Sequence, residues 1–139
     1  MITEASAFID YNFAPPCLRR DVAILGLIHK RALGLAHVAY EQLLPFAPLS
    51  WYSLPRPPQH NKQLNIHRDL CIYKHNMFNR SIFGMVDVYN RLSQRMVNYD
   101  SVKSFQSELT KIAKQRCARG EATWKTTFSC EGFAQQDFV

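Results

Sequence analysis

Apolar residues recur at steps of three and four in three long stretches of the chain, which is the spacing of helices that bury one face. The first stretch covers about residues 18–35 and aligns Leu18, Val22, Leu25, Ile28, Ala32 and Leu35. The second covers about 77–92 and aligns Phe78, Ile82, Met85, Tyr89 and Leu92. The third covers about 101–118 and aligns Val102, Phe105, Leu109, Ile112 and Ala113. The pattern therefore predicts three amphipathic helices.

Residues that begin or end helices stand at the edges of these stretches. Gly34 predicts the end of the first helix, because glycine readily adopts the left-handed conformation that closes many helices. A short helix over 38–44 is expected next, and Pro45 ends it because proline lacks a backbone N–H. Ser101 is a typical N-cap for the last helix, and Gly120 follows its final turn.

The remainder of the chain lacks this periodicity. Residues 45–76 form a predicted loop, because the first part of this segment holds five of the seven prolines. Residues 1–16 are predicted to be an irregular lead-in and 121–139 a loose tail, which leaves 17–120 as the helical module. The predicted fold class is therefore mainly α: a small bundle of three to four amphipathic helices with a Pro-rich irregular middle segment.

Basic residues outnumber acidic ones by 17 to 11, so the formal net charge is +6. An excess of this sign attracts phosphates, and the expected partner is RNA, DNA or an acidic protein surface. The predicted nucleic-acid-binding residues lie on outer helix faces and along the middle segment: Arg19, Arg20, Lys30, Arg31, Lys62, Arg68, Lys74, Arg80, Lys103, Lys111 and Lys114. Solvated helix faces that keep a protein soluble give the same composition, and this alternative stays open.

One cluster has the spacing of metal ligands. His67, Cys71 and His75 are four residues apart, so on a helix they would line one face and could offer three ligands to zinc. A fourth ligand would have to come from a distant position such as His60 or Cys117. The spacing is not that of paired CxxC motifs, and the favoured interpretation is ordinary polar residues on a basic surface. No metal or other cofactor is therefore predicted.

The sequence holds no group of residues that predicts catalysis. Polymerase chemistry needs clustered carboxylates around two divalent metals, whereas Asp87 and Asp100 each stand alone. Cys71 has neighbouring histidines but no orienting acid beyond Asp69. His29 falls on the apolar face of the first helix, so we expect it to be buried with a backbone partner. The chain is predicted not to be an enzyme.

Cysteine usage and hydropathy indicate the compartment. The four cysteines are widely spaced and form no CxxC pair: Cys17, Cys71, Cys117 and Cys130. No apolar run approaches the roughly 18 residues that cross a bilayer, and the first residues carry acids rather than the positive start of a secretory signal. The sequence therefore predicts an intracellular protein, nuclear or cytoplasmic, with reduced thiols and no membrane insertion.

Two sequence blocks follow one another in the order and spacing of a known family. In the first, Arg19-Arg20 leads into an apolar helix that ends in a Gly34-Leu35 turn. The second combines an F-x-R-x-I helix from Phe78, a Tyr89-Asn90 turn and an S-V-x-x-F-Q-x-x-L helix from Ser101 to Leu109. Together they resemble the tail that follows the polymerase domain in reverse-transcriptase polyproteins of non-LTR retrotransposons. The family's Leu-Pro is Leu92-Ser93 here and its usual Trp is Tyr89, which indicates a diverged copy.

The resemblance implies a role beside a larger machine. The parent polyproteins copy RNA into DNA at a nicked target, and their C-terminal regions are thought to help hold RNA or target DNA. No catalytic residue can be transferred, and Arg80 and Asn90, which match motif positions, are expected to be structural. The predicted function is a non-catalytic accessory module that supports RNA or DNA binding. The alternative is a structural or interaction subunit that packs its apolar helix faces on a larger protein assembly.

Overall fold

The computed structural model describes residues 2–47, 59–65 and 81–129, and these residues fold mainly into helices. The α-helices are α1 (Glu4–Tyr11), α2 (Pro16–Ala32), α3 (Ala39–Leu43), α6 (Ile82–Asn90), α7 (Gln94–Val97) and α8 (Val102–Ala118). A short 3₁₀ helix, η2 (Trp124–Thr126), follows α8. The predicted mainly α class is confirmed. In the described part of the chain, every helix is too short or too polar to cross a membrane.

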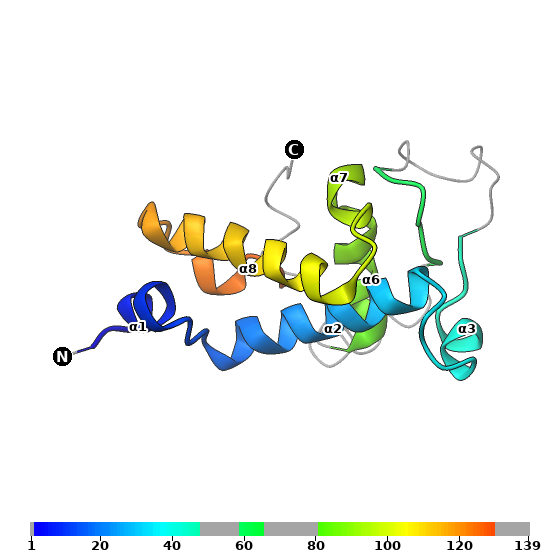
Figure 1. Cartoon of the computed structure of the whole chain (residues 1–139), viewed down its shortest axis with the longest axis horizontal. Coiled ribbons are helices and arrows are strands. Elements are labelled where there is room, and N and C mark those ends of the chain that lie inside the picture. Colours follow the sequence, from blue (N-terminus) through cyan, green and yellow to red (C-terminus); the bar gives the residue numbers. More distant parts are fainter. Residues whose placement is uncertain (1, 48–58, 66–80, 130–139) are drawn as a thin grey trace.

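The two longest helices form the centre of the molecule. Figure 1 shows α8 lying along α2, with α6 crossing the C-terminal half of α2 and α3 beyond the end of α2. At the opposite end, α1 and η2 pack against α8. The core fills the space between these helices with apolar side chains: Phe8, Leu18, Leu25, Ile28, Met85, Val86, Val88, Tyr89, Phe105, Leu109 and Ala113. Full burial of each large apolar side chain contributes about 1.5–3 kcal/mol.

Most of the described residues on the predicted apolar faces of α2, α6 and α8 lie in this core or pack against it. Leu35 was expected on the face of the first helix, but its side chain is 61% exposed. The reason is that α2 ends at Ala32 and Gly34 turns the chain with a φ of 76°. Leu35 therefore lies beyond the helix, where the helical repeat no longer determines which way its side chain points.

A glycine brings α2 and α8 close together. A Cβ atom added at Gly26 would lie 2.1 Å from Nε2 of Gln106, so no larger residue fits there without displacing that side chain. The Gln106 amide uses the space to donate a hydrogen bond to the Val22 carbonyl across the helix pair, at 3.3 Å. The close approach thus links the backbone of α2 to a side chain of α8.

The prediction of an irregular lead-in over 1–16 is wrong, because α1 occupies most of it. A reciprocal capping box begins α1: the Ser6 N–H donates to Thr3 Oγ1 at 3.1 Å and the Thr3 N–H donates to Ser6 Oγ at 3.0 Å. Phe8 is fully buried and stacks on Trp124, with ring centroids 5.5 Å apart. Glu4 forms an ion pair with Lys125.

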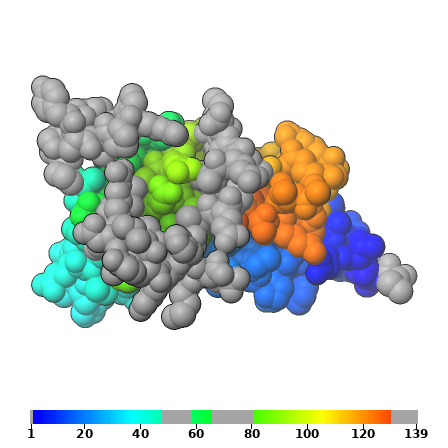
Figure 2. All heavy atoms as spheres, turned by 180° about the vertical axis from the view of Figure 1, so that it is seen from behind, coloured from blue at the N-terminus to red at the C-terminus, as the bar shows by residue number. Residues whose placement is uncertain are grey.

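The described part of the predicted loose tail, residues 121–129, is also packed. Trp124 and Phe128 are buried in the core, and the hydroxyl of the buried Thr127 donates to the Trp124 carbonyl at 2.6 Å. Figure 2 shows the orange segment at the end of α8 seated directly against the blue residues of α1 and α2. The two ends of the described chain therefore stabilise each other.

The limits of the later helices agree with the prediction in one case and differ in another. α8 begins after Ser101, whose Oγ accepts the Ser104 N–H at 3.1 Å, as the N-cap prediction required. α6 begins only at Ile82, with Ser81 as its N-cap, rather than at about 77. The expected contribution of Phe78 lies outside the described residues. The short α7 was not predicted, because four residues are too few to carry a periodic pattern.

Within the predicted loop 45–76, residues 45–47 and 59–65 are described and form no helix. They meet in one isolated antiparallel bridge between Phe46 and Leu64. The Ala47 N–H donates to the Gln63 carbonyl and the Asn65 N–H donates to the Pro45 carbonyl, each at 2.9 Å. In these parts the prediction of an irregular segment is confirmed.

Candidate nucleic-acid interface

An open groove of about 580 Å³ runs between α8 and the surface formed by α1 and the start of α2. Phe8, Leu18 and Val22 give it an apolar floor. The positively charged residues along it are Arg19, Lys103, Lys111 and Lys114. Neutral hydrogen-bonding side chains stand between them: Asn12, Gln106, Ser107 and Thr110. The groove thus combines long cationic side chains with neutral polar ones, of which Gln106 and Thr110 already donate to the Val22 and Gln106 carbonyls.

Helical spacing brings the α8 residues to one face. Lys103, Ser107, Lys111 and Lys114 follow one another at steps of four, four and three, so they line the same side of the helix. Phe105 and Leu109 fill the opposite side and hold α8 against the core. Arg19 reaches the groove from the first turns of α2, one turn before Ala23, which also lines it.

Among the described residues, no acid forms an ion pair with a cation of the groove. None of its described lining residues is Asp or Glu. The acids on or near these helices have other partners where ion pairs are formed: Glu108 contacts Arg95 at 3.4 Å, and Glu4 pairs with Lys125. Two of the cations instead lie over aromatic rings, with Arg19 5.1 Å from the centroid of Phe13 and Lys114 5.6 Å from that of Phe8.

The structure brings together residues that the sequence placed in two separate groups. Arg19 joins Lys103, Lys111 and Lys114, although more than eighty positions separate it from the first of them. Lys30 is exposed at the other end of α2, outside the groove. Arg20 contacts the buried Asp21 at 3.5 Å. Burial raises the pKa of the Asp21 carboxyl, and Arg20 offsets part of that effect.

The expectation that Arg31 faces outward is wrong. Its side chain is buried, its Nε donates to the Leu44 carbonyl at 3.0 Å, and its guanidinium lies 4.3 Å from the centroid of the Phe46 ring. The chain after α2 turns back at Gly34, so α3 and the residues after it cover this position. Arg31 therefore anchors the C-terminal end of α2 and is not available to a phosphate.

The other predicted residues lie away from the groove or beyond the described chain. Lys62 is half-buried in the segment 59–65, where its backbone N–H donates to His60 Nδ1 at 3.0 Å. The predicted nucleic-acid contacts outside the described residues are Arg68, Lys74 and Arg80. The metal-ligand candidates His67, Cys71 and His75 also lie outside them. Nowhere in the described ranges do three or more His, Cys, Asp or Glu residues gather as a metal site would require.

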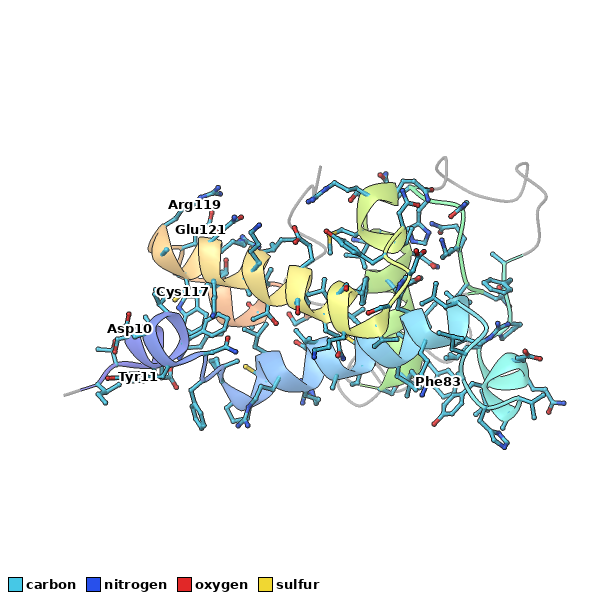
Figure 3. The ribbon with its side chains drawn as sticks, in the orientation of Figure 1. Asp10, Tyr11, Phe83, Cys117, Arg119 and Glu121 are labelled. Atoms are coloured by element: carbon cyan, nitrogen blue, oxygen red, sulfur yellow. The ribbon has the colours of Figure 1, made fainter. Side chains whose placement is uncertain are left out.

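The two distant candidates for a fourth zinc ligand are used in packing. His60 is buried, and its Nε2 donates to the Tyr89 carbonyl at 2.8 Å. Cys117 is buried near the end of α8 that faces α1, and burial raises the pKa of its thiol (Figure 3). A raised pKa favours the protonated thiol, which is a poor metal ligand.

A buried cluster of aromatic and histidine side chains lies where α2, α6 and α8 meet. His29 stacks on Phe105 with centroids 4.2 Å apart, and its Nδ1 and Nε2 contact the Tyr89 hydroxyl at 2.9 Å and the Tyr99 carbonyl at 2.7 Å. A carbonyl can only accept, so His29 Nε2 carries the hydrogen and Nδ1 accepts from Tyr89. The predicted burial of His29 with a backbone partner is confirmed.

Both histidines of this cluster are held in the neutral form. Burial lowers the pKa of His60 to about 4, although its hydrogen bond to the Tyr89 carbonyl acts in the other direction. Burial also lowers the pKa of His29, and it raises the pKa of the Tyr89 hydroxyl. Because both nitrogens of each ring already have partners, neither histidine is free to transfer a proton or bind a metal.

Of the two motif residues expected to be structural, Arg80 lies outside the described residues and Asn90 has a structural role. Asn90 is buried, accepts the Leu64 N–H at 2.9 Å and donates to the Leu64 carbonyl at 2.8 Å, which holds the segment 59–65 against α6. Asp87 pairs with Arg91, four residues further along the chain, at 3.3 Å. No family model, curated protein or solved structure matches the chain.

Sequence reasoning missed the contribution of α1 to the groove. Asn12 and Ala14 line it, and the aromatic side chains on either side of Asn12 are Tyr11 and Phe13. The Thr3-x-x-Ser6 spacing followed by Phe8 was a usable signal for a short capped helix. Asn12 adopts a left-handed φ of 57° and turns the chain toward α2. Asparagine tolerates this conformation better than most residues do.

Proposed function

We propose that this chain is a non-catalytic module that binds RNA or DNA through backbone phosphates in the basic groove. The observation that carries the proposal is the convergence of four cations from α2 and α8 on one groove without an acid among its described lining residues. Cations grouped in this way neutralise phosphates and release counterions on binding, which gives affinity without dependence on base sequence.

The proposed binding is electrostatic and therefore depends on salt. Each phosphate contact adds about 0.7–0.9 to the magnitude of the slope of log K against log salt. Engagement of all four groove cations predicts a slope of roughly −3. A protein whose basic residues were only solvated surface would bind weakly, and no single group of cations would dominate its salt dependence.

A binding role fits the described chain better than catalysis. Its buried titratable groups hold the fold together: His29 and His60 bond to Tyr89 and to backbone groups, and Asp21 faces Arg20. The resemblance of the two sequence blocks to the tail of non-LTR reverse-transcriptase polyproteins supports a more specific role. In it, the module holds RNA or target DNA for a larger reverse-transcribing assembly.

A pair of matched double variants tests the proposal. In R19Q/K103Q, one arginine of α2 and one lysine of α8 are removed from the groove. The control K30Q/R119Q removes one lysine of α2 and the arginine that follows α8 as its C-cap (Figure 3), both exposed and outside the lining of the groove. Titration of a labelled RNA hairpin at about 50 mM salt should show roughly tenfold weaker binding for the first variant only.

Equal affinities of these two double variants would contradict the proposed site. Absence of binding by the unmodified chain to both RNA and duplex DNA at low salt would contradict the proposed function. Melting temperatures of both variants should stay near that of the unmodified chain, because the removed charges are on the surface.

A second candidate function is docking to a protein assembly, and one observation favours it. The turn after α2 and the helix α3 expose large apolar side chains within a short segment: Leu35, Val38, Leu43 and Phe46. A patch of this kind predicts concentration-dependent self-association of the isolated chain, which the variant V38S/L43S should remove. Sedimentation velocity that finds a monomer at all concentrations would contradict this candidate.

A further inference from the structure

Two exposed aromatic side chains flank Asn12 at the rim of the basic groove. Tyr11 is 71% exposed and Phe13 is 63% exposed, on either side of Asn12, which lines the groove. Figure 3 shows Tyr11 beside α1 at the edge of the molecule, on the side away from α8. Solvated aromatic rings are common singly, but two beside a groove of four cations form a different surface.

The backbone at this rim is held in place. The Asn12 N–H donates to the Phe8 carbonyl and the Phe13 N–H donates to the Ala7 carbonyl, each at 3.0 Å. These bonds close the last turn of α1, and the left-handed conformation of Asn12 sets the direction of the chain that follows. Phe13 therefore follows directly on an ordered turn at the end of α1.

The ring of Phe13 contacts one of the four cations of the groove. The guanidinium of Arg19 lies 5.1 Å from the centroid of its ring. An aromatic face next to a phosphate-binding cation matches the two parts of a nucleotide, because bases stack on rings and phosphates pair with guanidinium groups.

We infer that the groove binds single-stranded nucleic acid, with phosphates along α8 and at Arg19 and an unpaired base stacked on Phe13. This inference rests on the proposed function and narrows it to one class of ligand. A duplex keeps its bases stacked on each other, so it could use the lysines but not the ring of Phe13.

The dimensions of the groove agree with a short single strand. Lys103 and Lys114 are eleven residues apart, so they are separated by roughly 16 Å along the helix. At about 3.4 Å for each phosphate of a stacked strand, this distance corresponds to about five nucleotides.

The test compares a labelled 12-nucleotide oligouridylate with a 12-base-pair duplex, using the full chain and fluorescence anisotropy. The informative variant is F13L, which keeps apolar volume and removes the aromatic face. Its matched control is F46L, because Phe46 is also half-exposed beneath an arginine guanidinium but lies next to Arg31, away from the groove. Melting temperatures verify that both variants are folded.

F13L should weaken binding of the oligouridylate by between about fivefold and a hundredfold, the usual range for loss of one stacked base. F46L should have no effect, F13W should restore the affinity, and duplex binding should be the same for all three variants. The slope of log K against log salt should change by less than about 0.7, the contribution of one phosphate contact, because no cation is removed.

Three results would overturn the inference: tighter binding of the duplex than of the single strand, equal affinities of F13L and F46L, or a preference for anionic phospholipid vesicles over the oligouridylate. If R19Q/K103Q still weakens nucleic-acid binding in the first two cases, the proposed function stands and only the single-strand assignment fails. If R19Q/K103Q has no effect either, both fail together.

Discussion

The two ends of the α2–α8 pair use polar side chains in opposite ways. At the C-terminal end of α2, His29 and its neighbours are buried, and every ring nitrogen of the cluster has a hydrogen-bond partner. At the N-terminal end, the groove leaves four cations exposed or half-exposed without an acidic partner in its described lining. Polar groups that are fully hydrogen-bonded favour one packing arrangement. Cations without an acidic partner can still pair with an anionic ligand. The first region therefore supports the fold, and the second is where we place the function.

The largest expected effect comes from removal of the aromatic centre of the buried cluster. Phe105→Ala deletes the ring on which His29 stacks and leaves a cavity at a fully buried position, so the free energy of unfolding should fall by about 3–5 kcal/mol. Urea unfolding followed by circular dichroism measures this. F46A, at a half-exposed ring, should cost under about 1 kcal/mol. Similar losses in the two variants would contradict the assignment of the cluster as the centre of the fold.

A smaller effect is expected from acid. Unfolded histidine takes up a proton below about pH 6.5, whereas folded His60 does so only near pH 4, so unfolding binds protons between these values and stability falls as the pH is lowered. His60 alone should lower the free energy of unfolding by about 2 kcal/mol between pH 7 and pH 5. His29, whose pKa is also lowered, acts in the same direction.

Unfolding free energies measured from pH 7 to pH 4 test this dependence. H60Q should be less stable at pH 7 and should show a flatter pH profile than the unmodified chain. H37Q changes an exposed histidine outside the cluster and serves as the control. An unchanged slope in H60Q would show that protonation of the cluster is not what acid disrupts.

The smallest effect concerns the contact that joins the two regions. Gly26→Ala forces the Gln106 side chain away from its place against α2, so its hydrogen bond to the Val22 carbonyl is lost. Gln106→Ala lowers the free energy of unfolding. This loss should be about 0.5–1.5 kcal/mol smaller in the G26A background than in the unmodified chain. A double-mutant cycle measures the difference, and strict additivity would mean that Gly26 and Gln106 do not interact.

Features of the fold that depend on near neighbours in the chain could be predicted from sequence. The faces of α2 and α8 follow from a local repeat, and Ser101 and Gly120 mark the ends of α8 through their own conformational preferences. The burial of His29 followed from its position on an apolar face. α1 was missed because eight residues before a Pro-Pro pair carry too little periodicity to outweigh an irregular interpretation.

Features that depend on distant parts of the chain could not be predicted in this way. Arg31 looks like any outer-face cation until α3 turns back over it. Trp124 and Phe128 have no helical spacing, and Trp124 belongs to the core because η2 packs against α8 and α2 and its ring stacks on Phe8. The groove itself exists because Arg19 meets α8 across the helix pair, and its charge was visible in the composition while its location was not.

The salt dependence of binding tests the central claim most directly. We predict a slope of log K against log salt of roughly −3 for a labelled oligouridylate between about 50 and 200 mM salt. The slope should lose about 1.5 in magnitude in R19Q/K103Q and stay unchanged in K30Q/R119Q. Equal slopes for the two double variants would contradict the account, because the groove cations would then contribute no more than other cations on the surface.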